Sequence, residues 1–465
     1  MKKMNNTKIS LKRVMAVIML FTLMVSLNAC GVRDKAGETS KSVVVKEPEA
    51  TKSGEIKEPE ATKSSGTKEP EVEPGDVSGD LPLDTPIETV TLDDETRANL
   101  YDATGEFAFE LLRNCDKSER NILISPTSVM LALGMTANGG TGETLKEMEN
   151  VLGGEGADLE SINAFYKEYA DKLQEGEEIK VNIANSIWVN KDAIDNVKDV
   201  FVSTLQNFYG SQIYKETFDS NTVEMVNNWV KENTDGMIEK LLDQFEGSEV
   251  MILINAICFD GEWEEIYYED QVRETKFTTA TGGEVEVEGM YSDEDLYIED
   301  ENTTGVIKDY KGGYSFVALL PSEDVSIDDY VANLTYDKYE SLMDSKREAI
   351  VQTMLPKFQY DYSEEMDEAL MEMGMSSAFE KTGADFSNMT EDDIEMYIGK
   401  VLHKTYIEVG EKGTRAAAVT AVLMDGCEAF EEKEVKSVTL DRPFVYMIID
   451  KENEMPLFIG VVRDI

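Results

Sequence analysis

Histidine is nearly absent from this chain, which has 465 residues and a single histidine, His403. A Ser/His or Cys/His catalytic pair would have to use that one residue, and a zinc site would lack its usual ligands. His403 alternates with apolar neighbours in Lys400–Val409, which predicts a strand and a buried, hydrogen-bonded ring rather than a catalytic base. We therefore expect neither an enzyme nor a bound metal or cofactor.

Basic residues are also scarce, since 44 lysines and arginines face 94 aspartates and glutamates, which gives a formal net charge of -50. Contact with nucleic-acid phosphates would be repulsive over most of such a surface, so we expect no nucleic-acid partner. Gly153–Lys180, where a basic patch could recruit a polyanionic activator, carries mostly acidic charge, and we expect no such activator. Gly139–Gly142 lacks the lysine and the preceding strand of a phosphate-binding loop.

Cysteines number only four, Cys30, Cys115, Cys258 and Cys427. If Cys30 is lipidated, three remain, and an odd number cannot form a closed disulfide framework. Cys115 and Cys258 lie in apolar patterns, which predicts small buried core residues rather than redox partners. Cys427 differs from these two because it lies in a polar segment.

The first 29 residues contain five basic side chains, no acidic ones and an apolar run, Val14–Leu27, that is too short to span a membrane comfortably. This pattern indicates a secretory signal at 1–29. It ends in Leu27-Asn-Ala-Cys-Gly31, which resembles a bacterial lipobox. We expect Cys30 to carry a lipid anchor at the bacterial cell surface, on the extracellular side of the membrane; the alternative is an ordinary signal peptide with an incidental cysteine.

Residues 30–91 contain too few apolar groups to offset chain entropy, which predicts a disordered, extended tether stiffened by proline. A ligand-binding role is the alternative. The tether includes an internal repeat of related segments, Lys46–Gly54, Lys57–Gly66 and Lys68–Glu71.

The remainder, 92–465, has no further linker and mixes helical and strand patterns without strict alternation, which favours one α+β domain. Helical spacing relates Phe107 to Leu111 and Leu112, and a second helix is expected after Ser125-Pro126. Short β-branched, apolar runs predict strands at 181–189, 251–259, 314–320 and 445–449.

The first part of Glu411–Phe430 has the small and β-branched residues typical of a strand, and its last part is a polar loop. Gly413 permits a bend, and alternation along a strand would put Thr414 on one face and Arg415 on the other. If the segment paired in a sheet, hydrogen bonds and burial would release on the order of 10–20 kcal/mol before entropy is counted, more than typical domain stability. From this segment alone, an ordinary surface hairpin is equally compatible.

Residues 92–465 resemble the serpin family in many motifs that occur in the same order along the chain. The resemblance implies an α+β fold of three β-sheets, with a large central mixed sheet, about eight or nine surrounding helices and a mobile reactive-centre loop. The matching segments are Asn121–Ser128, Asn228–Val230, Thr234–Ile238, Asn255–Trp263, Leu355–Phe358, Ala384–Ser387, the His403 strand, Asp441–Phe444 and Phe458–Val462.

The resemblance also assigns positions on the central sheet. It implies a shutter beneath the sheet and a breach where the loop enters, formed by Ser125, Ser128, Asn255, Trp263 and His403. It implies a hinge of small residues typical of inhibitory members, although Arg415 departs from the usual acidic residue. The hinge residues are Gly413, Thr414, Arg415, Ala416, Ala417, Ala418, Val419 and Thr420.

A monomeric protease inhibitor is the function that the resemblance implies. The protease would attack the loop, form an acyl-enzyme and be trapped as the loop inserts into the central sheet. The alternative is a non-inhibitory serpin that acts as a binding or chaperone module.

Counting fifteen residues from the hinge glycine, as the resemblance implies, predicts the reactive bond Cys427-Glu428. Alignment from the downstream side would move it to about Glu432, and Leu423, Met424 and Phe430 are other candidates. Since 416–432 contains no lysine or arginine, trypsin-like targets are disfavoured. We expect elastase-like or subtilisin-like serine proteases, with cysteine proteases as an alternative.

Overall fold

The computed structural model describes residues 90–465 except 118, 175–179, 248 and 416–432. All described residues belong to one compact unit, Glu71–Ile465. The predicted signal at 1–29 and nearly all of the predicted tether at 30–91 therefore lie outside the described residues. Among the described helices, none combines the length and apolar character needed to cross a bilayer.

Ten α-helices and one short 3-10 helix lie in the described part of the chain. Asp93 caps α2 by accepting a hydrogen bond from the backbone N–H of Thr96 (2.7 Å), and Ser125 caps α3, which begins at Pro126. Both helices confirm the prediction from apolar spacing. The α-helices are α2 (Asp94–Cys115), α3 (Pro126–Ala137), α4 (Gly142–Gly153), α5 (Leu159–Leu173), α6 (Asp199–Tyr209), α7 (Ser220–Asn233), α8 (Ile327–Ala332), α9 (Tyr336–Asp344), α10 (Asp367–Glu372) and α11 (Ser376–Phe379), and the 3-10 helix is η2 (Glu269–Gln271).

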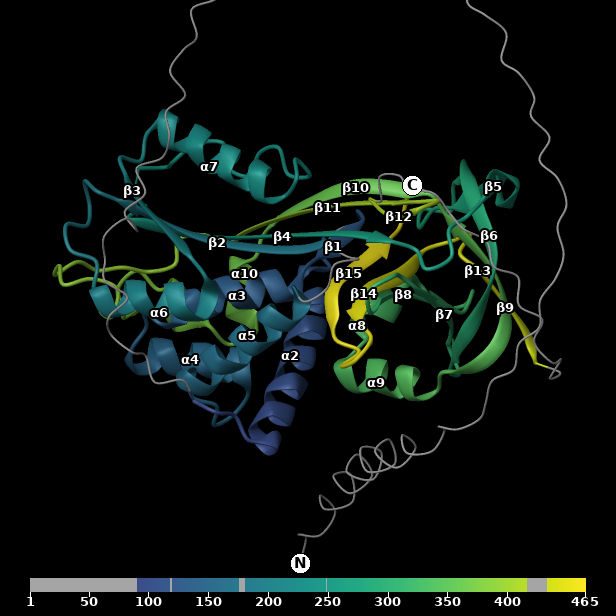
Figure 1. Ribbon diagram of the computed structural model, residues 1–465, viewed down its shortest axis with the longest axis horizontal. Coiled ribbons are helices and arrows are strands. Elements are labelled where there is room, and N and C mark those ends of the chain that lie inside the picture. The colour runs from purple at the N-terminus through teal and green to yellow at the C-terminus, as the bar shows by residue number, and fades with distance from the viewer. Residues whose placement is uncertain (1–89, 118, 175–179, 248, 416–432) are drawn as a thin grey trace, which may run out of the picture. The chain divides into compact units, whose positions relative to one another are not determined.

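A six-stranded mixed sheet forms the centre of this unit, in the order β10-β11-β12-β4-β2-β3. β2 and β3 are parallel, and the other neighbouring pairs are antiparallel. Figure 1 shows α7 on one face of the sheet and α3, α4, α5 and α6 on the other. The strands are β2 (Lys180–Asn190), β3 (Gln212–Glu216), β4 (Met251–Glu262), β10 (Phe358–Glu365), β11 (Leu402–Gly410) and β12 (Gly413–Thr414).

The two faces of the central sheet bury separate hydrophobic clusters. On the α7 side, Trp188 stacks on Tyr214 with ring centroids 4.2 Å apart, and Trp229 of α7 belongs to the same cluster. Ile187 and Ile257 belong instead to the main core. Because alternate residues of a strand face opposite sides, β2 and β4 contribute to both layers.

The second sheet has nine strands, and the 16-residue strand β6 joins its two halves. The first part of β6 pairs with β5, and its last part pairs with β7. β9 pairs with β6 from Gly289 to Tyr297, with a register shift between Glu294 and Leu296. Two of the three expected sheets are thus continuous here. The strands are β1 (Ile122–Ile124), β5 (Val272–Thr278), β6 (Glu284–Glu299), β7 (Thr303–Asp309), β8 (Tyr314–Pro321), β9 (Arg347–Pro356), β13 (Val435–Thr439), β14 (Phe444–Asp450) and β15 (Pro456–Val462).

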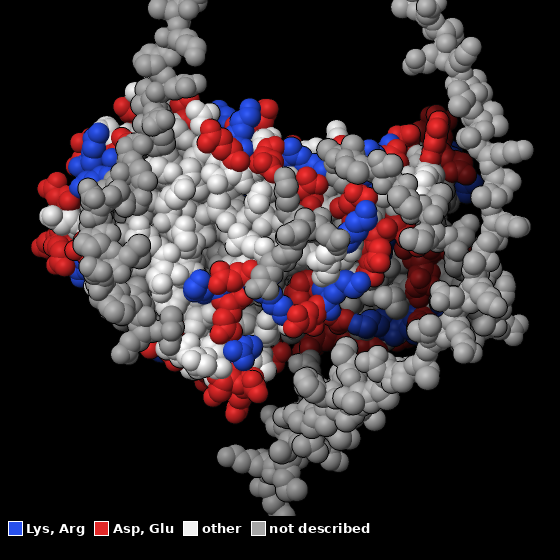
Figure 2. Space-filling model, in the orientation of Figure 1, with Lys and Arg blue, Asp and Glu red and all other residues white. Residues whose placement is uncertain are grey.

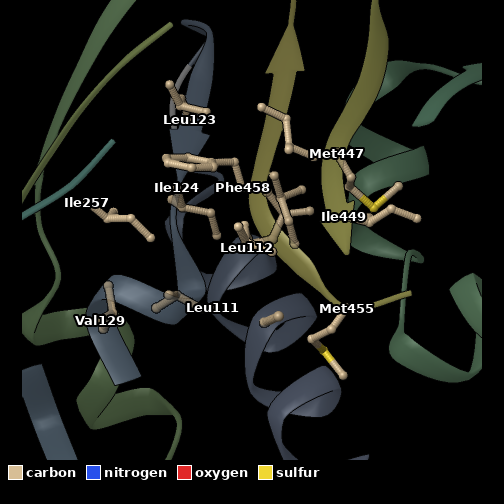
Figure 3. Close-up of a cluster of buried hydrophobic side chains, with 14 of the residues drawn as sticks. Leu111, Leu112, Leu123, Ile124, Val129, Ile257, Met447, Ile449, Met455 and Phe458 are labelled. Atoms are coloured by element: carbon tan, nitrogen blue, oxygen red, sulfur yellow. The ribbon is translucent and has the colours of Figure 1, made fainter. Parts of the chain in front are cut away.

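The main core lies where α2 and α3 pack against β1, β14 and β15 (Figure 3). Leu112 of α2, Ile124 of β1, Val129 of α3 and Phe458 of β15 are all buried there. All four strand segments predicted from apolar runs, at 181–189, 251–259, 314–320 and 445–449, are confirmed as β2, β4, β8 and β14. The apolar runs predicted as strands therefore contribute buried residues to the core.

Cys115 and Cys258 are buried free thiols, as predicted. Burial raises the pKa of Cys115 to about 12, so this thiol stays protonated at neutral pH. Cys427 lies outside the described residues.

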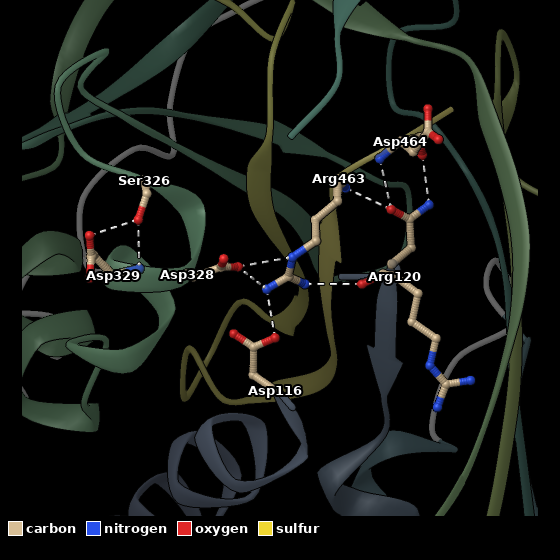
Figure 4. Close-up of polar contacts among 8 residues, drawn as sticks. Asp116, Arg120, Ser326, Asp328, Asp329, Arg463 and Asp464 are labelled. Atoms are coloured by element: carbon tan, nitrogen blue, oxygen red, sulfur yellow. Dashed lines mark hydrogen bonds and ion pairs between the residues drawn. The ribbon is translucent and has the colours of Figure 1, made fainter. Parts of the chain in front are cut away.

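Arg463 anchors the C-terminal end of β15 (Figure 4). Its side chain is 1% exposed, and its guanidinium lies 2.6 Å from Asp116 Oδ1 after α2 and 2.9 Å from Asp328 Oδ1 in α8. It also donates a hydrogen bond to the carbonyl of Arg120 (3.1 Å). Because a buried guanidinium without partners is costly, these contacts fix the end of the chain against two helices.

Candidate functional site: hinge, breach and shutter

The predicted hinge begins inside the central sheet. β11 ends at Gly410, the chain turns, and β12 runs back with Val409 opposite Thr414 and Gly410 opposite Gly413. The other edge of β12 pairs with the end of β4, so that Gly413 lies opposite Glu262. Among the described strands, β11 and β4 are joined through β12 alone. Two hinge residues thus already occupy a strand position between β11 and β4.

Gly413 fits this position because it has no side chain. A Cβ atom there would lie 2.0 Å from the backbone oxygen of Gly261 in β4, and the φ angle of +152° is one that other residues rarely adopt. The obstacle is backbone, which cannot move aside as a flexible side chain would. The close approach of β12 to β4 therefore requires glycine.

We expect Gly413→Ala to lower the free energy of unfolding by about 2 kcal/mol or more, because the methyl group overlaps the β4 backbone. Urea unfolding would measure the loss. Gly410→Ala is the matched control across the same turn, since a Cβ atom at Gly410 meets nothing within 4 Å. Equal stability of the two variants would contradict the close approach of β12 to β4.

Thr414 and Arg415 face different surroundings. Thr414 is 3% exposed, and its hydroxyl is hydrogen-bonded to the hydroxyl of Tyr310 at 2.5 Å. Arg415 has a φ angle of +48° and donates from Nη2 to the carbonyl of Asp235 (2.7 Å), after α7. Its backbone N–H donates to the carbonyl of Glu408 in β11 (2.9 Å). The arginine is therefore held at the edge of the site.

Residues 416–432 lie outside the described residues, and they include Ala416, Ala417, Ala418, Val419 and Thr420 of the hinge and the bond Cys427-Glu428.

Trp263, the predicted breach residue, fixes the turn between β11 and β12. Its side chain is fully buried, its Nε1 donates to the carbonyl of Gly410 (2.9 Å), and its backbone N–H donates to the carbonyl of Lys412 (2.9 Å). The indole stacks on Tyr310 with ring centroids 4.2 Å apart. Tyr310 therefore links the indole to Thr414, a role that sequence reasoning missed.

A buried ion pair lies beneath the breach. Lys308 Nζ is 2.7 Å from Glu294 Oε1, and the two side chains are 6% and 12% exposed. The same ammonium lies 4.6 Å from the ring centroid of Tyr267. At the turn itself, Glu411 pairs with Lys357 at 2.8 Å. Neither ion pair could be predicted from a local sequence pattern, because the two members of each pair come from separate strands or loops.

His403, the predicted shutter histidine, is buried on β11. Its Nε2 accepts a hydrogen bond from the backbone N–H of Ser125 (3.1 Å), so the neutral ring carries its proton on Nδ1. Burial lowers the pKa of His403 to about 4, which keeps the ring neutral at pH 7. Ser125 Oγ donates to the carbonyl of Leu457 in β15 (2.8 Å) and accepts from the backbone N–H of Ser128 (3.3 Å). The contacts connect the start of α3 to both sheets.

Asn255 joins a different group of side chains. Its Nδ2 donates to Asn185 Oδ1 on β2 (2.7 Å), and Asn185 Nδ2 donates to the carbonyl of Tyr209 (2.7 Å). Within the described residues, Asn255 Oδ1 is buried without a partner, so no hydrogen bond joins it to His403. The structure thus brings Ser125, Ser128 and His403 together and leaves Asn255 apart from them.

Figure 2 shows acidic and basic side chains mainly along the edges of this face and on its right side, and a broad uncharged area on its left. No three His, Cys, Asp or Glu side chains within the described ranges are grouped as metal ligands would be.

Comparison with protein families identifies the family to which this fold and site belong. The family model described as serpin (serine protease inhibitor) matches residues 102–465. The chain belongs to the serpin family. Members of this family are generally protease inhibitors rather than catalysts, and they typically work as monomers. The fold described above, with a large mixed central sheet, is the serpin fold.

Solved serpin structures align over most of this serpin. The thermophilic serpin tengpin in its native state aligns with a TM-score of 0.76 and 41% identity, over 85% of this chain and 100% of tengpin. Tengpin in its latent state aligns with a TM-score of 0.70 and 40% identity, over 81% of this chain and 100% of that chain. The described conformation is therefore more similar to the native state of tengpin than to its latent state.

A curated relative and a more distant solved structure also align with this serpin. Serpin B6 of Pongo abelii is 30% identical over 380 residues, which cover 78% of this chain and 98% of that protein. The complex of thyroxine-binding globulin with thyroxine aligns with a TM-score of 0.69 over 78% of this chain and 99% of that chain, at 23% identity. That likeness establishes the fold alone.

Proposed function

We propose that this serpin inhibits proteases by trapping them as acyl-enzymes while the cleaved loop inserts into the central sheet. The observation that carries the proposal is β12, since Gly413 and Thr414 already pair with both β11 and β4. Continued pairing in the same direction would extend this short strand between its two neighbours. The small residues that follow, Ala416–Ala418, suit such an extension because they are readily buried.

Two further features support a sheet that opens and closes. The shutter joins β11 to α3 through one hydrogen bond, from the Ser125 backbone N–H to His403. Asn255 Oδ1 on β4 is a buried acceptor without a partner, which costs about 1–3 kcal/mol. A strand added between β11 and β4 would bring new donors to this part of the sheet. The unpaired acceptor therefore favours insertion.

Incubation with a panel of serine and cysteine proteases tests inhibition. We expect complexes that survive denaturing electrophoresis with proteases whose primary pockets are small or apolar, such as elastase-like or subtilisin-like enzymes. Trypsin-like enzymes are the matched negative set, because 416–432 contains no lysine or arginine. Cleavage by every protease without a stable complex would instead favour a non-inhibitory binding module.

The bond cut during inhibition is expected to be Cys427-Glu428. The length of strand that inserts fixes the count from Gly413, and Cys427 is of medium size and uncharged. Mass spectrometry of the fragment released on complex formation identifies the bond. A new N-terminus at Glu428 is expected, and one at Asp425 or Lys433 would overturn the count.

We also propose that a lipid on Cys30 anchors this serpin at the extracellular side of a bacterial membrane. After expression of the full chain in a bacterium, the protein is expected in the membrane fraction. Cys30→Ser removes the acceptor thiol and is expected to move the protein to the soluble fraction. An unchanged distribution would contradict lipidation at this residue.

A further inference from the structure

The strand pairing of β12 stops at Arg415. Thr414 pairs with Val409, and at the next position the backbone N–H of Arg415 donates to the carbonyl of Glu408 (2.9 Å). The φ angle of Arg415 is nevertheless +48°, in the left-handed region that residues with side chains rarely adopt. Continued pairing between β11 and β4 requires an extended backbone at this residue. Arg415 must therefore change its backbone conformation before β12 can lengthen.

A left-handed conformation at a residue with a side chain persists only where the surroundings stabilise it. The guanidinium group of Arg415 supplies such a contact, because its Nη2 donates a hydrogen bond to the carbonyl of Asp235 (2.7 Å), in the turn that follows α7. Among the described residues, Nη1 is buried without a partner, so the hydrogen bond from Nη2 carries this contact.

The guanidinium lies close to both strands that would flank an inserted strand. Burial raises the pKa of Cys258 on β4 and the pKa of Tyr406 on β11, and the charge of Arg415 opposes each rise. The positive charge is therefore within electrostatic reach of β4 and of β11. The contact with Asp235 is thus made at the place where the sheet would have to accept a new strand.

The turn that accepts the hydrogen bond is itself firmly held. Asp235 also has a left-handed φ angle, +49°, and the next backbone N–H, that of Gly236, donates to the carbonyl of Lys231 in α7 (2.7 Å). Ile238 follows, and it is buried in the hydrophobic cluster that contains Trp229 on the α7 side of the central sheet. The turn therefore gives the arginine a fixed acceptor rather than one that moves with the hinge.

The identity of the residue at 415 matters for this contact. The serpin resemblance implies an acidic residue at this position, and a carboxylate has no N–H group to donate to the Asp235 carbonyl. A guanidinium has five such donors. The arginine thus adds a contact that an acidic residue could not make.

We propose that Arg415 is a positioning residue that latches the hinge to the turn after α7 and so slows insertion of the uncleaved loop. The latch is the hydrogen bond from Arg415 Nη2 to the carbonyl of Asp235. This inference rests on the proposed function, since a latch on the hinge has an effect only if the sheet accepts a new strand. The latch stabilises the left-handed backbone at Arg415 and keeps β12 at two residues. Its release lets the backbone at 415 become extended.

Incubation of the uncleaved full chain at a mildly raised temperature tests the latch. The fraction of protein that unfolds at a raised thermal midpoint, as the cleaved parent is expected to do, is followed over time. Arg415→Met removes every side-chain N–H donor, and conversion should be about tenfold faster than in the parent, the factor expected for losing a hydrogen bond from a charged donor. Equal rates in the parent and this variant, or no conversion in either, would overturn the latch.

Two further variants separate the latch from a general loss of contacts. Lys215→Met removes one positive charge and one hydrogen bond to a backbone carbonyl, that of Asp195 (2.8 Å), on the edge strand β3 of the same sheet, and it should convert at the rate of the parent. Arg415→Lys keeps a donor and should convert more slowly than Arg415→Met. Equal acceleration by Lys215→Met, or no rescue by lysine, would contradict the latch.

The cleaved proteins give a readout that a merely structural role would not leave unchanged. Insertion releases the latch, so cleaved Arg415→Met and the cleaved parent should have the same thermal midpoint. An equal fall of the midpoint in the cleaved and uncleaved variant would mean that Arg415 only supports the fold, and the proposal would be wrong.

The same measurements distinguish failure of the latch from failure of the proposed function. If the cleaved parent showed no raised midpoint, insertion itself would be wrong and the latch would fall with it. If the cleaved parent showed the raised midpoint while Arg415→Met converted no faster than the parent, the latch alone would be wrong.

Discussion

Thr414→Arg is expected to convert this serpin from an inhibitor into a substrate. Thr414 is buried between β11 and β4 and hydrogen-bonded to Tyr310, so an arginine would bring an unpaired guanidinium into the sheet. A buried, unpaired charge costs about 3–5 kcal/mol, so the arginine is expected to leave the sheet in the uncleaved protein and would have to be buried again on insertion. A barrier raised by about 3 kcal/mol slows insertion roughly a hundredfold. Deacylation would then precede trapping. Denaturing electrophoresis with a responsive protease should show cleaved serpin in place of the complex.

Thr414→Ser is the matched control for this prediction. It keeps the hydroxyl that meets Tyr310 and adds no charge, so complex formation should stay near the level of the parent. If Thr414→Arg formed complexes at the parent's stoichiometry, burial of the side chain at 414 would not be needed for trapping, and the proposed continuation of β12 would be wrong.

His403 is expected to make this serpin less stable below pH 6.5. Burial lowers its pKa in the folded protein to about 4, whereas the unfolded chain binds a proton near pH 6.5. Between these values the unfolded state holds more protons, so the contribution of His403 is complete above pH 6.5 and is lost as the pH falls to 4. Two and a half pKa units correspond to about 3 kcal/mol.

His403→Gln isolates that contribution from the titration of the many carboxylates. Its side-chain oxygen can accept the hydrogen bond from Ser125 but does not titrate. The difference in free energy of unfolding between the parent and this variant should shrink by about 3 kcal/mol from pH 7 to pH 4. Parallel urea-unfolding curves across that range would contradict a neutral, buried His403.

His403→Ala is the disruptive companion variant. It leaves the backbone N–H of Ser125 without its partner, which costs about 1–3 kcal/mol in a buried site. Size-exclusion chromatography after mild heating should show a smaller monomer fraction and more loop-inserted or polymeric protein. An unchanged monomer fraction would argue against a shutter role.

Short apolar runs were sufficient to predict four of the described strands, β2, β4, β8 and β14. Residues 181–189 and 251–259 form β2 and β4. Each run is short, β-branched and apolar, so its strand preference can be recognised from local sequence alone. The join between the two smaller sheets was not predicted. It depends on the length and the register shift of β6, and alternation alone does not specify register with neighbouring strands.

The site was harder to predict because its contacts are long-range. Tyr310 and Lys308 have no motif of their own, and they reach Trp263 and Thr414 only through tertiary packing. The resemblance grouped Asn255 with His403, yet these residues lie on strands that are separated by β12 in the sheet order. A sequence match locates a residue on a strand but does not determine which neighbour it contacts in a given state.

The central claim is that the chain beyond Thr414 becomes a strand between β11 and β4 after cleavage, and thermal unfolding before and after loop cleavage tests it most directly. A protease that cuts within 416–432 and is then removed would supply the cleaved protein. The new strand adds hydrogen bonds and buried side chains, so the unfolding midpoint should rise by about 10 °C or more. Cleaved Thr414→Arg should show a much smaller rise. A midpoint that stays unchanged after cleavage of the parent protein would contradict insertion.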